Sequence, residues 1–182
     1  WDPGDGSDTI EGQDGTDELL FNGSNGAEIM EASANGDRVR FTRNLGNIVM
    51  DLDGVEKLSV NALGSTDTIL VNDLSGTDVA EVAIDLAGTL GGTAGDAQAD
   101  TVITNPTNGG EVIEVFGSGS SYSVVGLSAL VNVANSEGAN DALVINGLDG
   151  DDSITATTMP AGVVKLTLDG GDGNDTLLGS QG

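Results

Sequence analysis

The stretch that decides the expected fold is Gly170-Gly171-Asp172-Gly173-Asn174-Asp175-Thr176-Leu177-Leu178. It fits, position by position, the nonapeptide G-G-x-G-x-D-x-U-x, in which U is a large apolar residue. Glycine permits positive φ and lets bare backbone carbonyls approach a ligand closely. The aspartate adds a charged oxygen, which is the ligand type that Ca²⁺ prefers. The pattern therefore predicts turns of a parallel β-helix that bind calcium.

Three further stretches carry the same pattern with one departure each. They begin at Pro3, Gly12 and Gly147, and each has aspartate in the sixth position and an aliphatic residue in the eighth. The departures are proline for the first glycine, glutamine for the second and leucine for the second, respectively. Four copies in one chain favour a repeated structural unit over chance. A set of Asp-Gly turns without any ion remains the alternative.

On these motifs the chain resembles the RTX, or haemolysin-type calcium-binding, family of secreted bacterial proteins. Residues 1–22 are similar to the exit of a repeat array, and residues 67–88 and 99–105 to spacer modules between arrays. The middle of the chain departs from the family because it lacks most of the glycines. The resemblance implies a secreted, extracellular or cell-surface location. It also implies calcium ions and the flanking repeats of one parent chain as partners.

The resemblance also implies a set of ligands, because the family holds calcium with turn carbonyls and with sixth-position aspartates shared between stacked turns. Residue by residue, the implied carboxylate ligands are Asp8, Asp17, Asp152 and Asp175, and the implied carbonyl donors include Gly171 and Gly173. The third-position aspartates either assist or are simply solvated; they are Asp5, Asp14, Asp149 and Asp172. Consecutive nonapeptides lie on opposite sides of a roll. Asp8 and Asp17 are therefore expected to lack stacking partners.

Two other sets of polar residues have expected structural roles. Asp67, Asp100 and Asp141 lie in degenerate turns and are expected to accept hydrogen bonds from turn amides rather than to hold calcium. Asparagines end several strands and are expected to stack in ladders, because asparagine tolerates corner conformations. They are Asn22, Asn61, Asn72, Asn105 and Asn146.

Apolar residues alternate in segments that recur about every ten residues, as in Val82, Ile84 and Leu86. Period two indicates strands with one face inward. The first half is repeated in the second, which places Glu28 on Glu111 and Asp67 on Asp152. We therefore expect a single elongated all-β domain, a right-handed parallel β-helix or β-roll solenoid. The middle rungs are expected to be three-sided and the terminal rungs two-sided.

Within residues 1–182 the expected sections are entry repeats at 1–20, degenerate rungs at 21–146 and exit repeats at 147–182. Segment 87–99 lacks a strand pattern and is expected to form a loop. The first residue is Trp1, and Gly179–Gly182 looks like the start of another repeat, so we interpret the chain as a module of a longer protein.

Composition restricts the possible functions. The chain has 30 acidic and 5 basic residues and a net charge of −25, which argues against nucleic acid or an anionic membrane surface as a partner. It has no cysteine and no histidine. Disulfides, zinc–thiolate sites, cysteine catalysis and the usual general base are thereby excluded. No apolar run is long enough for a membrane span, and a monomer is expected.

The leading functional hypothesis is non-enzymatic: a calcium-binding, calcium-stabilised extracellular spacer module of a large exported protein. One alternative is an adhesin or glycan-binding segment, which an exposed aromatic strip would favour. Another is an accessory module of a polysaccharide lyase or epimerase, in which Arg38 and Arg40 would grip a carboxylate sugar. With so few basic residues among so many acids, a role in salt bridges is the simpler interpretation of these arginines.

Overall fold

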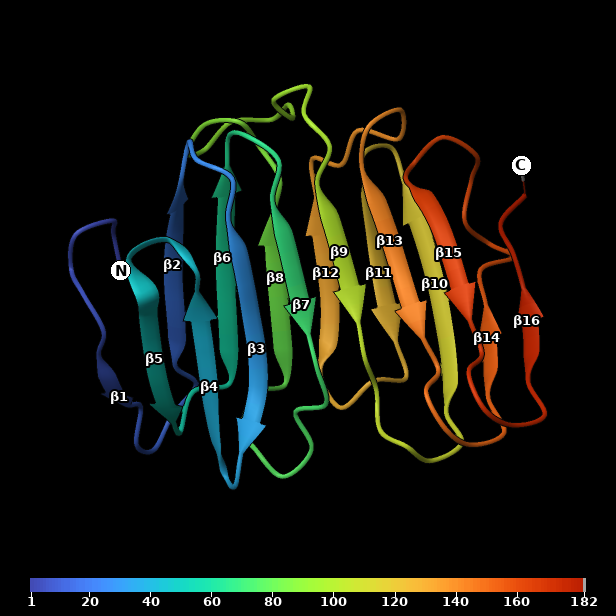
Figure 1. Cartoon of the computed structure of the whole chain (residues 1–182), viewed down its shortest axis with the longest axis horizontal. Helices are drawn as coiled ribbons and strands as arrows, with labels where there is room; N and C mark the ends of the chain where they lie inside the picture. Colours follow the sequence, from blue (N-terminus) through green and yellow to red (C-terminus); the bar gives the residue numbers. More distant parts are fainter. Residues whose placement is uncertain (182) are drawn as a thin grey trace.

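The computed structural model describes residues 1–181 and is all-β, with two eight-stranded sheets that face each other (Figure 1). Sheet A has the order β1 (Thr9–Glu11), β5 (Ile48–Asp53), β4 (Arg38–Arg43), β3 (Ile29–Asn35), β7 (Thr68–Val71), β9 (Thr101–Thr104), β13 (Ala142–Asn146) and β15 (Lys165–Asp169). Sheet B has the order β16 (Thr176–Leu178), β14 (Ser153–Thr155), β10 (Val112–Ser118), β11 (Ser121–Val125), β12 (Leu130–Ala134), β8 (Glu81–Asp85), β6 (Lys57–Leu63) and β2 (Glu18–Ser24). Within residues 1–181 the one helical segment is η1 (Leu45–Asn47).

Both sheets are mixed. Most neighbouring strands pair in parallel, as β7 does with β9 and β6 with β8. Two antiparallel meanders interrupt this arrangement, namely β3–β4–β5 in sheet A and β10–β11–β12 in sheet B. Outside the meanders, consecutive strands cross from one sheet to the other.

The expected right-handed parallel β-helix or β-roll solenoid is therefore wrong, and so are its three-sided middle rungs. The architecture is a sandwich of two sheets, each with antiparallel strands inside it. The reason is local. Gly36 (φ 73°) and Gly119 (φ 64°) allow tight turns that reverse the chain within one sheet. The Asn35-Gly36 pair between alternating segments is a hairpin signal, and it joins β3 to β4 as an antiparallel pair.

The two halves of the internal repeat lie in opposite sheets. The meander that begins with β3 belongs to sheet A, and the meander that begins with β10 belongs to sheet B. In the internal repeat, β9 is the equivalent of β2. The chain crosses between the sheets an odd number of times from β2 to β9, so each strand of the second half lies in the opposite sheet from its equivalent in the first half. Repeated positions such as Glu28 and Glu111 consequently lie on opposite edges of the sandwich.

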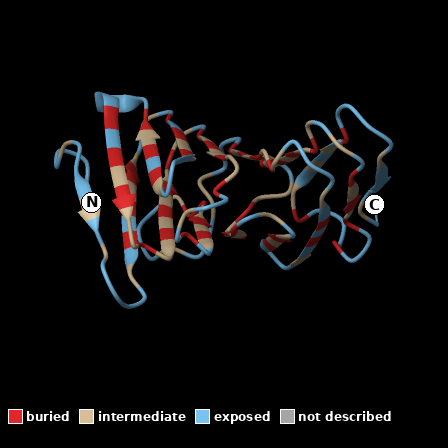
Figure 2. Cartoon of the chain, turned by 90° about the horizontal axis from the view of Figure 1, so that it is seen from below, coloured by how far each residue is buried: buried red, intermediate tan, exposed pale blue. Residues whose placement is uncertain are grey.

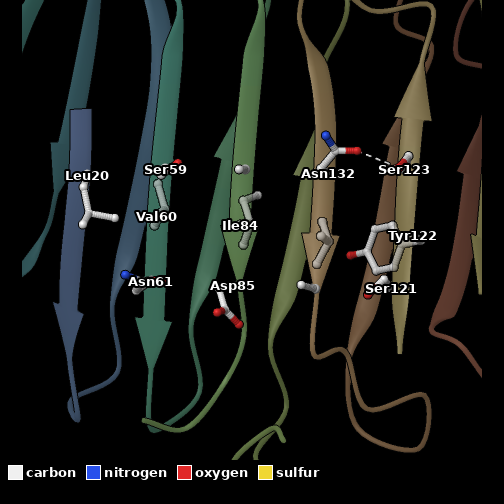
Figure 3. Close-up of a pocket in the computed structure, with 13 residues that line it drawn as sticks. Leu20, Ser59, Val60, Asn61, Ile84, Asp85, Ser121, Tyr122, Ser123 and Asn132 are labelled. Atoms are coloured by element: carbon white, nitrogen blue, oxygen red, sulfur yellow. Dashed lines mark hydrogen bonds between the residues drawn. The ribbon is translucent and has the colours of Figure 1, made fainter. Parts of the chain in front are cut away.

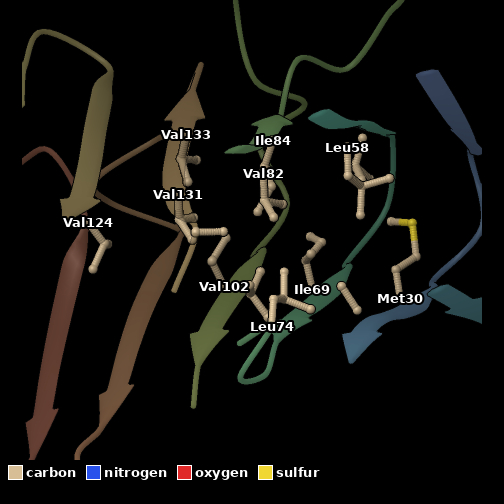
Figure 4. Packing of buried hydrophobic residues seen from close by; sticks show 14 of the residues in the cluster. Met30, Leu58, Ile69, Leu74, Val82, Ile84, Val102, Val124, Val131 and Val133 are labelled. Carbon is tan, nitrogen blue, oxygen red and sulfur yellow. The ribbon is translucent and has the colours of Figure 1, made fainter. Parts of the chain in front are cut away.

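The core lies between the sheets and is built from the inward residues of each strand. Burial alternates along the strands, as the striped ribbon of Figure 2 shows. In β8, for example, Val82 and Ile84 are buried, whereas the residues on either side of each are half-buried. Figure 4 shows Met30, Ile69 and Val102 from sheet A meeting Leu58 and Val82 from sheet B. Because these side chains are aliphatic and alternate strictly, the core needs few aromatic rings.

The two ends of the sandwich differ in their packing. At the N-terminal end Trp1 stacks on Phe21 with ring centroids 4.2 Å apart, and Phe21 meets Phe41 edge to face at 4.8 Å. At the C-terminal end β16 has no buried residue, and Leu178 is 50% exposed. Residues 86–100, between β8 and β9, contain no strand, which confirms the loop expected at 87–99. Among residues 1–181 no helix is long and apolar enough to cross a membrane.

Candidate metal centre

The turns that join the sheets form two edges of the sandwich. The A-to-B edge, at the bottom of Figure 1, holds the turns that lead from sheet A into sheet B, including those before β2, β10, β14 and β16. The B-to-A edge, at the top, holds the turns before β3, β7, β9 and β13. An acidic residue immediately precedes each of these eight strands. Each edge thus carries a row of carboxylates.

The glycine-rich turns 147–152 and 170–175 stack directly on each other at the A-to-B edge. The amide of Gly150 donates to the carbonyl of Asp172 (2.8 Å), and the amide of Asp172 donates to the carbonyl of Leu148 (2.7 Å). Asp149 and Asp172 form a parallel bridge. The structure therefore brings together the two nonapeptides of the C-terminal section, which begin at Gly147 and Gly170.

Carboxylates link these turns through backbone amides. Asp175 Oδ1 accepts the amide N–H of Asp152 (2.9 Å), and Asp152 Oδ1 accepts the amide N–H of Glu111 (2.7 Å). Asp152 is 2% exposed and Asp175 is half-buried. Burial raises the pKa of Glu111 above its ordinary value. Each carboxylate uses one oxygen in this row and leaves the other for a further partner.

Glycine is required where the turns approach each other. A Cβ on Gly171 would lie 1.8 Å from the carbonyl oxygen of Leu148, and a Cβ on Gly173 would lie 1.7 Å from that of Gly150. These contacts are far shorter than any van der Waals distance. The motif glycines thus allow backbone to stack on backbone.

We expect Gly171→Ala to destabilise the protein, and Gly36→Ala to do so much less. Both glycines have nearly the same positive φ, 77° and 73°, but Gly36 has open space around its missing Cβ. The φ strain of about 1 kcal/mol is therefore common to both variants, and only Gly171→Ala must also separate two turns. Denaturant unfolding at fixed calcium concentration measures the difference. Equal losses would mean that the turns are not tightly stacked.

One buried carboxylate oxygen in these two turns has no partner. Asp152 Oδ2 is buried and accepts no hydrogen bond. It lies 2.4 Å from the place that a Cβ of Gly147 would take, and the carbonyl oxygen of Gly170 lies 2.4 Å from the same place. A buried charged oxygen without a partner is costly. A carboxylate and a carbonyl oxygen that converge in this way fit a hard cation such as Ca²⁺.

The carboxylates of the stack are arranged as a row rather than as a cage. Among residues 1–181 no group of three acidic side chains is placed so that it could hold a metal ion by itself. A cation here would take one or two carboxylates and complete its shell with carbonyls and water, which Ca²⁺ accepts.

The third-position and N-terminal candidates are less enclosed. Asp149 and Asp172 are exposed, as are Asp5, Asp8 and Asp14. Asp5 Oδ2 accepts the amide of Asp2 (2.8 Å), and the carbonyl of Asp8 accepts the amide of Asp51 (3.0 Å).

Asp17 has a stacking partner, which corrects the expectation that it would lack one. Glu56 Oε2 accepts the amide of Asp17 (2.7 Å), and the amide of Glu56 donates to the carbonyl of Asp17 (3.1 Å). Asp17 Oδ2 is buried without a partner, as Asp152 Oδ2 is. The turn before β2 therefore repeats the arrangement of the main stack with a glutamate in place of one aspartate.

Protein-family models, curated proteins and solved structures give no match to this chain.

The aspartates of the degenerate turns form the second row, at the B-to-A edge. Asp67 Oδ1 accepts the amide of Glu28 (2.8 Å), Asp100 Oδ1 that of Asp67 (2.8 Å), and Asp141 Oδ1 that of Asp100 (3.0 Å). Their expected hydrogen bonds to turn amides are thus confirmed.

The asparagine ladders are also confirmed. Asn146 donates to Asn105, and Asn105 donates to Asn72, each at 2.8 Å. Asn61 donates to Asn22 at 2.7 Å. These side chains satisfy one another and so serve the sheets rather than a ligand.

Three glutamates in the rows were not predicted as part of a site: Glu28, Glu56 and Glu111. Each immediately precedes a strand and does with a longer side chain what aspartate does in neighbouring turns. The internal repeat, which aligns Glu28 with Glu111, was the signal that could have revealed two of them.

A shallow groove of about 410 Å³ lies on sheet B (Figure 3). Its polar side chains already bond one another or neighbouring strands. Ser123 donates to Asn132 (2.7 Å), Asn132 donates to Glu81 (3.0 Å), and Asp85 accepts from Asn135 (2.7 Å). Tyr122 is 2% exposed. The groove therefore offers few free polar groups and no aromatic platform.

Proposed function

We propose that this chain is a calcium-binding, calcium-stabilised structural module that belongs to a large exported protein of the RTX type and works outside the cell. The observation that carries the proposal is the stack of turns 147–152 and 170–175 with the unpartnered, buried Asp152 Oδ2. Supporting it are the nonapeptides themselves and the resemblance that they carry.

The charge of the chain favours the same proposal. A net charge of −25 on 182 residues opposes compaction. Arg38 is shared by Glu11, Asp51 and Asp53, and such pairs compensate only a few of the acids. Each calcium ion neutralises two charges and can bridge carboxylates that otherwise repel.

Binding and folding would then be coupled. A ligand that binds only the folded state stabilises it by about 2.7 kcal/mol when its concentration is one hundred times Kd. At the low free calcium concentration of a cytoplasm the turn stack would remain loose, and at extracellular calcium concentrations it would become ordered. The role is that of a spacer between flanking repeats of the parent chain.

Calcium titration of the full chain by calorimetry tests the proposal. We expect binding to the wild-type protein, and at least a tenfold weaker affinity at the main stack in Asp152→Asn, because an amide nitrogen replaces one oxygen. Asp37→Asn is the matched control, since it removes the same charge from the exposed β3–β4 turn. No calcium binding at millimolar concentration, or equal loss in both variants, would contradict the proposal.

The alternatives find less support in the described residues. Among the aromatic side chains of residues 1–181, Phe21, Phe41 and Tyr122 are buried, and Phe116 is the one ring that is largely exposed, at 43%. A glycan-binding strip of aromatic rings is thus not formed by residues 1–181. Arg38 is committed to three carboxylates, which leaves Arg40 alone to hold an acidic sugar.

A further inference from the structure

The row at the B-to-A edge is more deeply buried than the row at the candidate metal centre. Asp67, Asp100 and Asp141 are 0%, 2% and 1% exposed. Each lies directly before a strand of sheet A and is held by the amide of its neighbour in the row. These acids cannot rely on water to stabilise a negative charge.

The chain supplies positive charge at one end of this row only. Glu28, the first member, forms a buried ion pair with Arg43. Of the ion pairs formed within residues 1–181, this is the one that reaches the row. Asp67, Asp100 and Asp141 therefore need another source of compensation.

Neighbouring carboxylates make ionisation of the row still less favourable, although the amide of Glu137 donates to Asp141 Oδ2 (2.6 Å) and favours the charged form of that one residue. Asp96 from the loop 86–100 faces all three aspartates, and Glu137 from the turn before β13 faces Asp100 and Asp141. The phenol of Tyr122, which projects from sheet B, is close enough to sense Asp100 and Asp141. Asp67 Oδ2 is buried with no donor at all. Nothing stabilises the ionised form at that oxygen.

We propose that Asp67, Asp100 and Asp141 form a proton-binding row, whose carboxyl groups hold protons near neutral pH and whose deprotonation loosens the B-to-A edge. The device is separate from the calcium-binding function, because its residues lie on the opposite edge from the turns 147–152 and 170–175.

The loop 86–100 closes this edge and is held by the same kind of contact. Asp96 Oδ2 accepts the amide of Ser65 (2.6 Å), and Glu137 Oε2 accepts the amide of Ala97 (2.6 Å). Two more carboxylates thus join the loop to the turns beside the row. When the row gains negative charge, repulsion acts directly on these attachments.

Burial is the main cause that raises the pKa of Asp67 to about 8 and that of Asp100 to about 7, and it raises the pKa of Asp141 as well. An unfolded aspartate loses its proton near pH ~3.9. Between about pH 4 and pH 8 the folded state therefore binds more protons than the unfolded state. Stability is greatest below this window and falls as pH rises through it, by about tenfold in the folding constant per pH unit for each such proton.

The test follows the carboxyl carbon signals of the calcium-free full chain by NMR across pH 4 to 10, together with denaturant unfolding at each pH. We expect the Asp67 carboxyl to titrate more than two pH units above the ordinary aspartate value of about 3.9. Asp67→Asn keeps the acceptor for the Glu28 amide and removes the titrating group. Between pH 6 and pH 9 the folding constant of this variant is expected to fall by a factor at least ten times smaller than that of the wild-type protein. In Asp37→Asn the fall should equal that of the wild-type protein.

Two results would overturn the proposal. One is a normal titration of all three aspartates in the calcium-free protein, which would mean that the row is ionised. The other is a titration of Asp67 near neutral pH that disappears when stoichiometric calcium is added, which would identify the row as a second metal site. If Asp67→Asn fails to fold, the wild-type carboxyl titration alone decides between these outcomes.

Discussion

Replacement of Phe21 by alanine is expected to lower the free energy of unfolding by about 3–5 kcal/mol, the usual cost of truncating a buried phenylalanine. Phe21 is 0% exposed, stacks on Trp1 and meets Phe41 edge to face. In a core that is otherwise largely aliphatic, this cluster contains the largest side chains at the N-terminal end. The cavity left behind would be bounded by two rings that small movements cannot bring together.

Phe116→Ala is the matched control, because Phe116 lies on β10 but is 43% exposed. It should cost about 1 kcal/mol or less. Denaturant unfolding of both variants at one calcium concentration measures the difference, since bound ligand changes the apparent stability. Similar losses in the two variants would show that the Trp1–Phe21–Phe41 cluster is not part of the folded core.

Replacement of Arg43 by alanine is expected to cost about 3–5 kcal/mol, as is typical when one partner of a buried ion pair is removed. Arg43 is 7% exposed and Glu28 is 1% exposed. The variant leaves the Glu28 carboxylate buried without its cation, and it removes the guanidinium that lies 5.5 Å from the Trp1 ring centroid. Much of the loss should be recovered in the double variant Arg43→Ala/Glu28→Gln, in which the unpaired charge is gone.

Arg40→Ala is the control for this prediction. Arg40 lies on the same strand, β4, is exposed and forms no ion pair with any residue from 1 to 181. Its removal should change the free energy of unfolding by about 0.5 kcal/mol or less. If Arg43→Ala were as mild as Arg40→Ala, the ion pair would be solvated in solution, and the B-to-A edge would be more open than the structure shows.

Local features of this fold could be predicted from the sequence, and its topology could not. The alternation in segments such as 81–85 gives the strands and their inward faces, because period two leaves few other ways to bury Val82 and Ile84. Whether a turn leads into the other sheet or back along the same sheet depends on a few backbone angles. The turns at Asn35-Gly36 and at Gly119 are compatible with either course of the chain. The solenoid prediction assumed that the chain passes on to a new side, whereas it turns back within the same sheet.

The candidate site was likewise predictable in part. The position of aspartate within each nonapeptide indicated Asp152 and Asp175, and the structure places them in one row. Glu56 and Glu111 were missed because a motif written in aspartates does not accommodate a longer side chain that reaches the same amide. The burial of Asp67, Asp100 and Asp141 depends on the loop 86–100 and on Glu137, which are distant in sequence from Asp67.

Hydrogen exchange of the full chain with calcium and with excess chelator tests the central claim most directly, because it locates the effect of the ion along the sequence. Chelation is predicted to remove protection from residues 1–20 and 147–181, where the cores are thin and the glycine-rich turns carry clustered acids. Residues 22–142 should remain protected by their buried aliphatic core. Uniform loss would mean that calcium organises the whole sandwich, and no change at residues 147–181 would contradict calcium binding at the stacked turns.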